Sequence, residues 1–336
     1  LADDHGRDMG IDSVLALDAD GRFLALKADY TVNIGAYLSG RSLFMVNNIG
    51  GVAGVYRIGA IAASITGVYT NTMTNAPYRG AGRPEATYTI ERLLALAARK
   101  LGIDPFELRQ HNLVPPAAMP YDTGFVFTYD CGEFEGLMTE AARLADRGGF
   151  AARRADTERR GLLRGLGIAN PIEVAGGPFT KPAKDMTQIA VTPDGRVKIT
   201  AGAMSTGQGL ETMMIDLVAA RLGIGRDRID YAFGDTDSLP YGRGNGGSSA
   251  APVVSSATVR ATDKVIETGK AIAAELLDAQ LEDIDFADGR FPLRGTNRSV
   301  SLAEVAARAG ESNPVGIVEK GEFSPPNVTF PNGCHI

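Results

Sequence analysis

Alternating apolar and polar residues mark two hairpins along the chain. Residues 13–17 and 22–32 flank the turn DADG at residues 18–21, and residues 188–201 surround a second turn, TPDG. Aspartate–glycine turns between such segments are typical of β-hairpins. Both turns continue into an arginine and lead to a glycine-bearing loop, NIG in the first case and GQG in the second. The pattern predicts two diverged structural repeats.

Apolar residues with a period near 3.6 predict several helices. Pro84 and Glu85 are typical of the first turn of a helix, and Gly102 is typical of its end. Asp104, followed by Pro105, begins the next helix as its N-cap. The remaining expected elements are helices at residues 133–147, 210–222 and 257–277, strands at residues 167–174 and 229–233, and an exposed charged helix at residues 153–164.

This mixture of hairpins and helices predicts an α+β fold, with mixed sheets and packed helices, instead of a regular βαβ array. A chain of 336 residues is long enough for about two domains. The charged segment is expected to separate two halves, residues 1–150 and residues 151–336.

Composition narrows the class of protein. Apolar residues make up 44% and charged residues 22% of the chain, as in folded proteins. The net charge of −6, with scattered basic residues, argues against a surface for nucleic acid or for an anionic membrane. No run approaches the roughly 18 apolar residues of a membrane-spanning helix. The two cysteines, Cys131 and Cys334, lie too far apart for a disulfide framework, so a reducing cytoplasm is expected.

The ends of the chain and its glycines add two expectations. The chain begins at Leu1 without a signal-peptide pattern and ends on FPNGCHI, which resembles the start of a strand. These ends predict a piece of a longer polypeptide, the alternative being a mature chain with trimmed ends. Glycine accounts for 41 residues, in clusters. Clustered glycines are typical of loops that approach a ligand closely or adopt positive φ.

The first candidate site is NAPYRGAGRPE, residues 75–85. Its GAG loop leads into the start of a helix, where unpaired N–H groups favour an anion or an oxo group. Arg79 is a charged donor suited to a carbonyl or an oxyanion. The alternative is a tight loop whose arginines cap carbonyls or pair with Glu85.

The second candidate is STGQGLET, residues 205–212, between an expected strand and a helix. It resembles a dinucleotide fingerprint without the third glycine, because Thr212 stands there, so a nicotinamide site is disfavoured. The amide of Gln208 donates and accepts hydrogen bonds, which suits a heterocycle or a metal-oxo ligand. Thr212 and the local amides suit a phosphate. The alternative is an ordinary glycine-rich helix start.

The third candidate is YGRGNGGSS, residues 241–249, whose glycines and serines precede a helix and predict an anion-binding nest. Asp235 and Asp237 form a lone Asp-x-Asp pair, which is more typical of a turn than of a magnesium site. Ser248 imitates a nucleophile elbow, but only His335 follows it, which leaves a serine hydrolase as a third alternative. The histidines are not at metal-ligand spacing, so no metal site of protein side chains is expected.

In this order the motifs resemble the molybdenum-binding large subunit of the xanthine dehydrogenase, aldehyde oxidase and aerobic carbon monoxide dehydrogenase family, in particular the bacterial carbon monoxide dehydrogenase-like large chains. The resemblance implies that residues 1–150 are part of a first molybdenum cofactor-binding subdomain and residues 151–336 part of a second. The matching stretches, which span nearly the whole chain, are HGRDMG, NIGAYLSG, PYRGAGRPEATYTIERL, YDCGEF, STGQGLET and FGDTDSLPYGRGNGGSSA.

The resemblance also implies roles for the candidate residues. Arg79 is the catalytic arginine near the substrate and the oxo group, and Gln208 is the glutamine near the oxo group and the pterin. The reaction is hydroxylation, which inserts water-derived oxygen into a C–H bond. The cofactor, molybdopterin cytosine dinucleotide in bacterial relatives, is contacted by Tyr78, Gly80, Ala81, Gly82, Gly207, Gln208, Gly209, Thr212, Gly246, Gly247, Ser248 and Ser249.

The implied partners are a small-molecule substrate, an iron–sulfur small subunit and an FAD-binding medium subunit, in a dimer of heterotrimers. These subunits take the electrons away from the molybdenum site.

Departures from the family pattern limit these expectations. Gly80 takes the place of the loop cysteine of carbon monoxide oxidisers, which favours an aldehyde or an N-heterocycle as substrate; Pro77 stands where relatives usually have alanine. The catalytic glutamate, in a Gly-x-Gly-Glu motif, does not occur here, and Glu311 and Glu322 lack its flanking pattern. We therefore expect part of a molybdenum hydroxylase that is inactive alone. The alternative is a non-catalytic assembly domain that binds no cofactor by itself.

Overall fold

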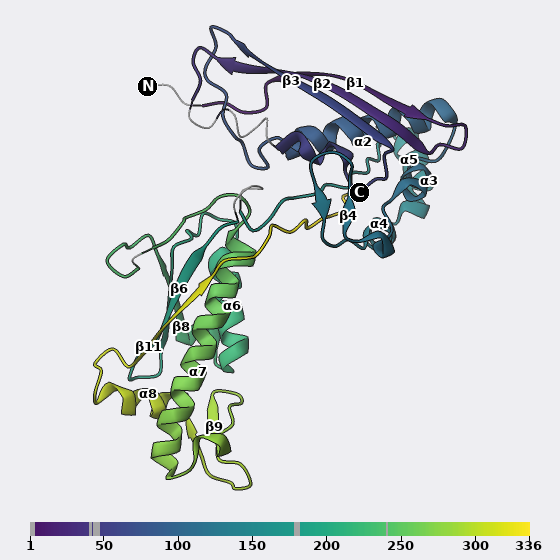
Figure 1. The fold of residues 1–336 in the computed structure, drawn as a ribbon. Helices are drawn as coiled ribbons and strands as arrows, with labels where there is room; N and C mark the ends of the chain where they lie inside the picture. The colour runs from purple at the N-terminus through teal and green to yellow at the C-terminus, as the bar shows by residue number, and fades with distance from the viewer. Residues whose placement is uncertain (1–3, 40–41, 43–47, 178–181, 240) are drawn as a thin grey trace. The chain divides into compact units, whose positions relative to one another are not determined.

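The computed structural model describes residues 4–39, 42, 48–177, 182–239 and 241–336. The chain forms two compact units (Figure 1). Unit 1 comprises Leu1–Glu173 and Thr329–Ile336, and unit 2 comprises Val174–Val328. The last eight residues therefore return to the unit in which the chain begins.

Unit 1 contains a three-stranded sheet of β1 (Met9–Leu17), β2 (Phe23–Gly35) and β3 (Ala60–Tyr69). β1 and β2 are antiparallel, joined at the DADG turn, and β2 and β3 are parallel. Buried and exposed residues alternate along β2, so one face of the strand contributes to the core and the other faces solvent. Ala28, Tyr30 and Val32 form that core together with Ile34 and Ile49.

The helices of unit 1 begin and end at the expected signals. α2 (Arg83–Leu101) has left-handed glycines at both caps, Gly82 and Gly102. The side chain of Asp104 caps α3 (Pro105–Asn112) by accepting hydrogen bonds from the backbone of Phe106 and Glu107. The helix expected at residues 133–147 ends earlier, as α4 (Phe134–Leu144), because Asp146 adopts a left-handed φ of 45°.

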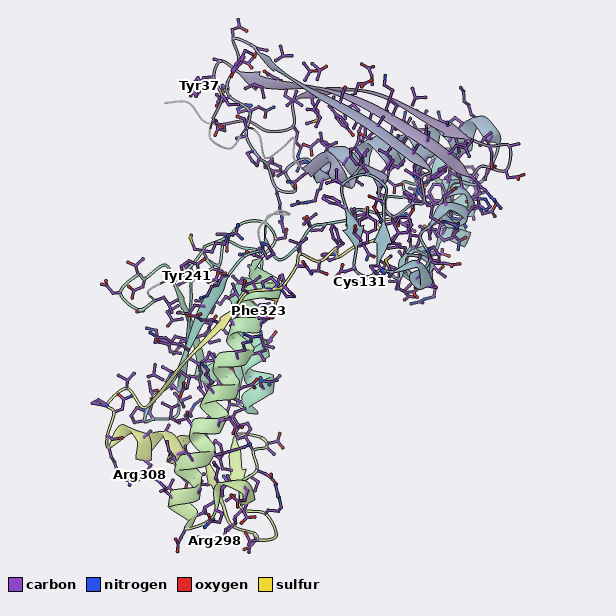
Figure 2. All side chains as sticks on the ribbon, viewed as in Figure 1. Tyr37, Cys131, Tyr241, Arg298, Arg308 and Phe323 are labelled. Atoms are coloured by element: carbon purple, nitrogen blue, oxygen red, sulfur yellow. The ribbon has the colours of Figure 1, made fainter. Side chains whose placement is uncertain are left out.

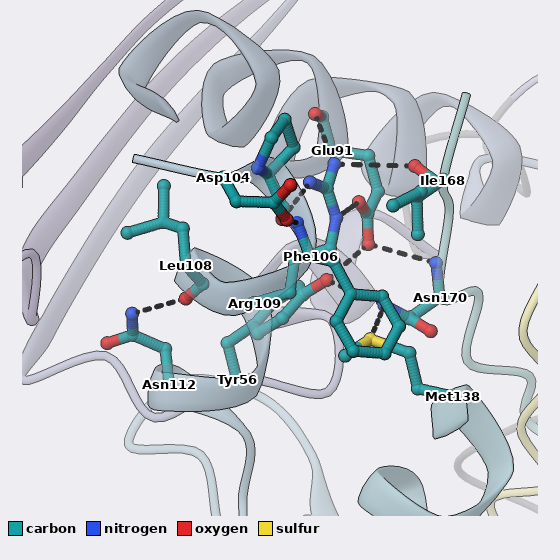
Figure 3. A network of polar contacts seen from close by, with 11 residues as sticks. Tyr56, Glu91, Asp104, Phe106, Leu108, Arg109, Asn112, Met138, Ile168 and Asn170 are labelled. Atoms are coloured by element: carbon teal, nitrogen blue, oxygen red, sulfur yellow. Dashed lines mark hydrogen bonds and ion pairs between the residues drawn. The ribbon is translucent and has the colours of Figure 1, made fainter. Parts of the chain in front are cut away.

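A buried polar network joins α2 to α3 (Figure 3). Arg109, 1% exposed, donates from Nε to Glu91 Oε2 at 2.7 Å. Glu91 Oε1 accepts from the Tyr56 hydroxyl at 2.6 Å and from the backbone N–H of Asn170 at 2.9 Å. Other N–H groups of Arg109 donate to the carbonyls of Pro105 and Glu91. Burial raises the pKa of Tyr56 well above its ordinary value, so this hydroxyl keeps its proton as a donor.

Unit 2 contains a four-stranded sheet in the order β11-β6-β7-β8, from β6 (Asp185–Val191), β7 (Val197–Ala201), β8 (Ile229–Phe233) and β11 (Ile317–Phe323). β7 and β8 are parallel and the other pairs are antiparallel. The long α7 (Ser255–Leu277) packs so closely on β11 that a Cβ at Gly321 would overlap the Ala257 carbonyl. α6 (Leu210–Leu222) lies beside α7 (Figure 1).

Shorter elements complete the two units. They are η1 (Asn48–Ala53), η2 (Pro116–Ala118), β4 (Tyr121–Asp122), β5 (Thr128–Tyr129), η3 (Arg147–Gly149), α5 (Phe150–Arg159), η4 (Arg226–Arg228), η5 (Ala250–Val254), η6 (Leu281–Asp283), β9 (Arg290–Pro292), β10 (Ser299–Ser301) and α8 (Leu302–Gly310).

The α+β class and the two diverged repeats are confirmed. The strands β1-β2-β3 and β6-β7-β8 have the same order and the same pattern, an antiparallel hairpin followed by a parallel third strand. Each hairpin turns at an Asp-Gly-Arg sequence, residues 20–22 in the first and residues 194–196 in the second, of the three that the chain contains.

Two expectations about the middle of the chain are wrong. Residues 167–174 form isolated bridges, Ala169 to His335 and Ile172 to Asn332, instead of a strand. Pro171 interrupts this stretch and cannot donate to a ladder. The charged helix is α5, which ends at Arg159, and the two units divide only after Glu173, so the helix lies inside unit 1. The assignment of residues 1–150 and 151–336 to two cofactor-binding subdomains stays a prediction.

Candidate functional site

The predicted site residues fall into one loop of unit 1 and two loops of unit 2. In unit 1, Tyr78 and Arg79 lead into three consecutive left-handed residues, Gly80, Ala81 and Gly82, with φ values of 95°, 45° and 96°. The loop closes on itself through hydrogen bonds from Ala81 N to Tyr78 O, 2.7 Å, and from Arg83 N to Gly80 O, 3.1 Å. The loop leads into the N-terminus of α2, whose N-cap residue, Gly82, makes no side-chain hydrogen bond to the first turn.

Arg79 is the arginine of this loop that stays available to a ligand. Its side chain is exposed, and among the described residues it has neither an ion pair nor a side-chain hydrogen bond. Glu85, the alternative partner expected for an arginine of this loop, pairs with Arg7 instead: Nη1 of Arg7 lies 3.4 Å from Oε2 of Glu85. Arg83 pairs with Glu173. A free guanidinium is suited to bind an oxygen of a ligand with charge-assisted hydrogen bonds.

Arg7 is a residue that the sequence did not single out. It lies in the HGRDMG stretch, one of those that resemble the family, and its side chain reaches the carbonyl of a residue 72 positions away. No local pattern predicts such a contact, since its partners are fixed by the tertiary fold.

In unit 2, the GQG loop leads into the N-terminus of α6. Gly209, in the left-handed region, is the N-cap and offers no side chain to the first turn. The first N–H groups of a helix have no acceptor within the helix, so those of Leu210 and Glu211 are available to an anion. Thr212 is exposed in the same turn.

Gln208 holds its own loop together. Its Oε1 accepts from the backbone N–H of Thr206 at 2.6 Å, and its Nε2 donates to the Met204 carbonyl at 2.8 Å. An amide nitrogen carries two hydrogens, so one N–H of Gln208 remains for a ligand. The exposed side chain thus combines loop support with a free donor.

The third loop is joined to the second. Asn245 Nδ2 donates to the same Met204 carbonyl at 2.8 Å. Farther along, the carbonyls of Gly247 and Ser248 accept from the backbone N–H groups of Gly177 and Gly176, and Ser249 Oγ donates to the Gly246 carbonyl. The structure therefore brings together the two predicted loops of unit 2, residues 207–212 and 246–249.

A buried carboxylate, that of Asp185, lies where the segments that lead into these two loops cross. Gly202 and Gly242 cross so closely that a Cβ on either would overlap the other's backbone, and Asp185 Oδ1 is 3.1 Å from the Cβ position of Gly202. Asp185 is 1% exposed; its Oδ1 accepts from the backbone N–H of Met186 at 2.8 Å. Its Oδ2 has no hydrogen-bond partner among the described residues. The hydroxyl of Tyr241, which is labelled in Figure 2, donates to the carbonyl of Lys184, the residue before β6, at 2.9 Å.

Replacing Asp185 with asparagine is expected to change how stability depends on pH. Burial raises the pKa of Asp185 above its ordinary 3.8, with only partial compensation by N–H groups of Met186 and Arg243. The folded state then binds this proton more tightly than the unfolded state, so wild type gains stability as the pH falls from neutral through the raised pKa. Asp185→Asn carries no titratable group at this position, so the variant should lack this gain in stability.

Urea unfolding of both proteins between pH 7 and pH 3 measures this difference. Asp194→Asn is the matched control, because the Thr192 hydroxyl lowers the pKa of that exposed carboxyl. It should show the opposite trend, with wild type losing stability relative to the variant at low pH. Parallel pH profiles for wild type and Asp185→Asn would contradict the prediction.

The alternative chemistries receive no geometric support. Asp235 folds on itself, accepting from the Asp237 backbone at 3.0 Å and from the Ser238 hydroxyl at 2.7 Å, and the described residues contain no group of three metal-ligating side chains. Ser248 has no histidine partner in the described part of the chain. A cavity of about 700 Å³ in unit 1, against α2, is lined by Tyr88, Arg92 and Arg99 and by none of the predicted site residues.

Within the described residues no helix is both long and apolar enough to cross a bilayer.

Comparison with known proteins gives consistent matches along both halves of the chain. Residues 1–113 and residues 140–336 each match a family model described as a molybdopterin cofactor-binding domain. The carbon monoxide dehydrogenase large chain of Hydrogenophaga pseudoflava is 31% identical over 98% of this chain and 44% of the relative. The 6-hydroxypseudooxynicotine dehydrogenase complex subunit gamma of Paenarthrobacter nicotinovorans is 31% identical over 99% of this chain and 43% of the relative.

Solved structures agree. Quinoline 2-oxidoreductase from Pseudomonas putida 86 superposes with a TM-score of 0.86 at 29% identity, over 99% of this chain and 45% of that one. The Cu,Mo-CO dehydrogenase superposes with a TM-score of 0.84 at 29% identity, over 98% of this chain and 44% of that one. The chain thus spans less than half the length of these relatives.

Proposed function

This chain belongs to the family of molybdopterin cofactor-binding domains, and from that premise we propose that it is part of the large subunit of a molybdenum-dependent hydroxylase. The observation that carries the proposal is the junction of two glycine loops at the Met204 carbonyl, beside the uncapped start of α6. It is supported by the exposed, unpaired Arg79 in the other unit.

The residues of unit 2 fit an anionic dinucleotide. Gly207, Gly209, Gly244 and Gly246 have no heavy atom within 4 Å of the Cβ position, so their backbone is open to a ligand. Free N–H groups at a helix start and in a glycine nest bind phosphate. We infer that Gly207, Gly209 and Thr212 hold molybdopterin cytosine dinucleotide together with Gly246, Gly247, Ser248 and Ser249.

When bound, the molybdenum cofactor supplies the oxidation of a substrate C–H bond with oxygen derived from water. The contribution of this chain is orientation and charge. Arg79 binds an oxygen or ring nitrogen lone pair of the substrate and stabilises negative charge that develops there. Tyr78 and residues 80–82 belong to the same loop as Arg79. Gln208 keeps its loop closed and offers its second amide N–H to the cofactor.

The general base that such a reaction needs is assigned to a segment outside residues 1–336. Glu322 is paired with Lys184 at 2.6 Å, which lowers the pKa of this carboxyl, and Glu311 is paired with Arg308. Both carboxylates are thus occupied on exposed surfaces. We therefore propose that this chain alone is inactive.

The proposed substrate is an aldehyde or an N-heterocycle and not carbon monoxide. Gly80 stands where carbon monoxide oxidisers carry a cysteine, and its geometry resists one. Its φ is 95°, and a Cβ would lie 2.5 Å from Pro84 Cγ. Two matched relatives are named for N-heterocyclic compounds, quinoline and nicotine.

The proposed assembly contains an iron–sulfur small subunit and an FAD medium subunit in a dimer of heterotrimers, located in the cytoplasm. One matched relative is itself named as a subunit of a dehydrogenase complex. Partner subunits of this kind would carry electrons from the molybdenum site to an acceptor.

The test is the molybdenum and acid-released nucleotide content of the whole protein that contains this chain. Wild type is expected to hold both, with cytidine as the nucleotide. Gly209→Asp should lose most of both, because it puts a negative charge where the phosphate is expected. Gly161→Asp is the matched control, since Gly161 is also left-handed with open space around it but lies outside the site.

The possible outcomes distinguish a molybdenum hydroxylase from a non-catalytic assembly domain. A wild-type protein without molybdenum or nucleotide would overturn the hydroxylase proposal and favour a non-catalytic assembly domain. Full cofactor in Gly209→Asp would show that the α6 start does not bind it. The same measurement on the isolated chain tells whether these loops suffice to retain the cofactor.

A further inference from the structure

The segment that precedes β1 lies along the Arg79 loop. The backbone N–H of His5 donates to the Thr74 carbonyl at 2.9 Å, and Ala76 N donates to the His5 carbonyl at 2.7 Å. Gly6 follows in such close contact with Tyr78 that a Cβ there would lie 2.7 Å from the tyrosine Cβ. Two backbone hydrogen bonds and a close approach therefore fix where the next residue, Arg7, stands.

The guanidinium of Arg7 makes three contacts around the loop. Its Nη2 donates to the Arg79 carbonyl, its Nη1 lies 3.4 Å from Glu85 Oε2, and its Cζ lies over the Tyr78 ring, 4.9 Å from the ring centroid. Arg7 itself adopts a left-handed φ of 63°. Such a backbone is unusual for a residue with a side chain, and here it accompanies contacts that reach both sides of the loop.

These contacts restrain the part of the loop that has least support of its own. Residues 80–82 all adopt left-handed φ values. Unlike the two glycines, Ala81 has a Cβ, which makes this backbone conformation unfavourable for it. The hydrogen bond to the Arg79 carbonyl fixes the peptide plane between Arg79 and Gly80. The pair with Glu85, whose side chain is 8% exposed, fixes the first turn of α2 at the other end.

We propose that Arg7 is a positioning residue that holds the Arg79 loop in its ligand-binding form. The proposal rests on the function proposed above for Arg79, and it deepens that function by naming what orients the catalytic arginine. Arg7 need not touch substrate or cofactor, since it acts through the peptide and ring that flank Arg79.

The shape of the side chain matters as much as its charge. One guanidinium serves an ion pair and a carbonyl with two different nitrogens while its Cζ lies over a ring. A lysine offers a single ammonium nitrogen and no flat face. Arg7→Lys should therefore keep only part of the effect, and Arg7→Gln should lose nearly all of it.

The experiment has two readouts on the same variants, Arg7→Gln, Arg7→Lys and the control Arg143→Gln. The control also removes an arginine paired with a glutamate, on exposed α4. The first readout is hydrogen exchange of the Ala81 and Arg83 amides, which bond within the loop. We expect exchange about 10-fold faster in Arg7→Gln, with an intermediate rate in Arg7→Lys and no change in Arg143→Gln or in the amides of α6.

The second readout is kcat/KM of the whole hydroxylase in a double-mutant cycle with Arg79→Gln. Arg7→Gln alone should lower kcat/KM about 10-fold. In the Arg79→Gln background the same change should lower it less than about 2-fold, because the group being positioned is gone. A role in overall stability alone would lower activity equally in both backgrounds.

Unchanged exchange at Ala81 and Arg83, or fully additive losses in the cycle, would overturn the proposal. If Arg7→Gln does not fold, Arg7→Lys decides by the same two readouts. Absence of hydroxylase activity in wild type would count against the proposed function only, since the exchange measurement still decides whether Arg7 holds the loop.

Discussion

Replacing Arg79 with glutamine is expected to lower kcat/KM of the whole enzyme about 10²–10³-fold without releasing molybdenum. The guanidinium is exposed and unpaired, so no structural contact is lost with it. What is lost is the charged donor that we propose stabilises negative charge on the substrate, and removal of one such donor has effects of this size. Steady-state kinetics with an aldehyde or N-heterocycle, together with metal analysis, measures both quantities.

Two further variants sharpen the result. Arg79→Lys keeps the charge but not the planar pair of donors, so an intermediate activity is expected. Arg92→Gln, on the exposed face of α2, is the control and should retain wild-type kinetics. Equal activity of Arg79→Gln and wild type would remove Arg79 from the mechanism, and loss of molybdenum in Arg79→Gln would mean that this arginine binds the cofactor instead.

Replacing Arg109 with methionine is expected to lower the free energy of unfolding of unit 1 by about 3–5 kcal/mol. The substitution leaves the Glu91 carboxylate buried without its ion pair, and leaves the carbonyls of Pro105 and Ile168 without their donor. The network also holds α3 against α2, so the loss weakens the packing between them. Urea unfolding followed by circular dichroism measures the change.

The double variant Glu91→Gln with Arg109→Met isolates the charge. Glutamine keeps an oxygen for Tyr56 and for the Asn170 N–H but carries no charge, so the double variant should be more stable than Arg109→Met alone. Arg143→Gln, which breaks an exposed pair, should lie within about 0.5 kcal/mol of wild type. A double variant less stable than Arg109→Met would show that shape and not charge dominates at this position.

The elements that sequence predicted well are those with local start and stop signals. α6 runs from Leu210 to Leu222 as expected, because Gly209 and Gly223 take left-handed caps at either end. β8 also has its expected bounds. Both hairpins follow from their Asp-Gly turns, whose residues determine the backbone locally.

The elements that sequence missed depend on distant neighbours. β3 contains small residues, Ala-Ile-Ala-Ala-Ser-Ile, inside a long glycine-rich apolar run, and becomes a strand by pairing with β2 over ten residues. Residues 167–174 have strand-like composition, yet their partners are the last residues of the chain and Pro171 breaks the ladder. In neither stretch does local composition determine the pairing.

The candidate site, like the fold, has features that the sequence predicts and features that depend on distant residues. Glycine loops before helices were visible in the sequence, and the structure joins the two of unit 2 at the Met204 carbonyl. The loop support from Arg7 and the buried carboxylate of Asp185 were not visible, because Arg7 contacts a residue 72 positions away and Asp185 lies against the backbone of Gly202 in another strand-to-loop segment. The motif alone also does not predict that the side chain of Gln208 forms hydrogen bonds within its own loop.

The return of residues 329–336 to unit 1 has a consequence for biosynthesis. Phe330 packs against Phe127 and Tyr129, with ring centroids 5.2 Å apart in both cases, and Asp130 accepts hydrogen bonds from the Thr329 hydroxyl and the Phe330 N–H. The ribosome makes all of unit 2 before it makes these residues, a delay on the order of ten seconds. During that interval the rings of Phe127 and Tyr129 lack their contacts with Phe330, so unit 1 gains these contacts only after unit 2 has been made.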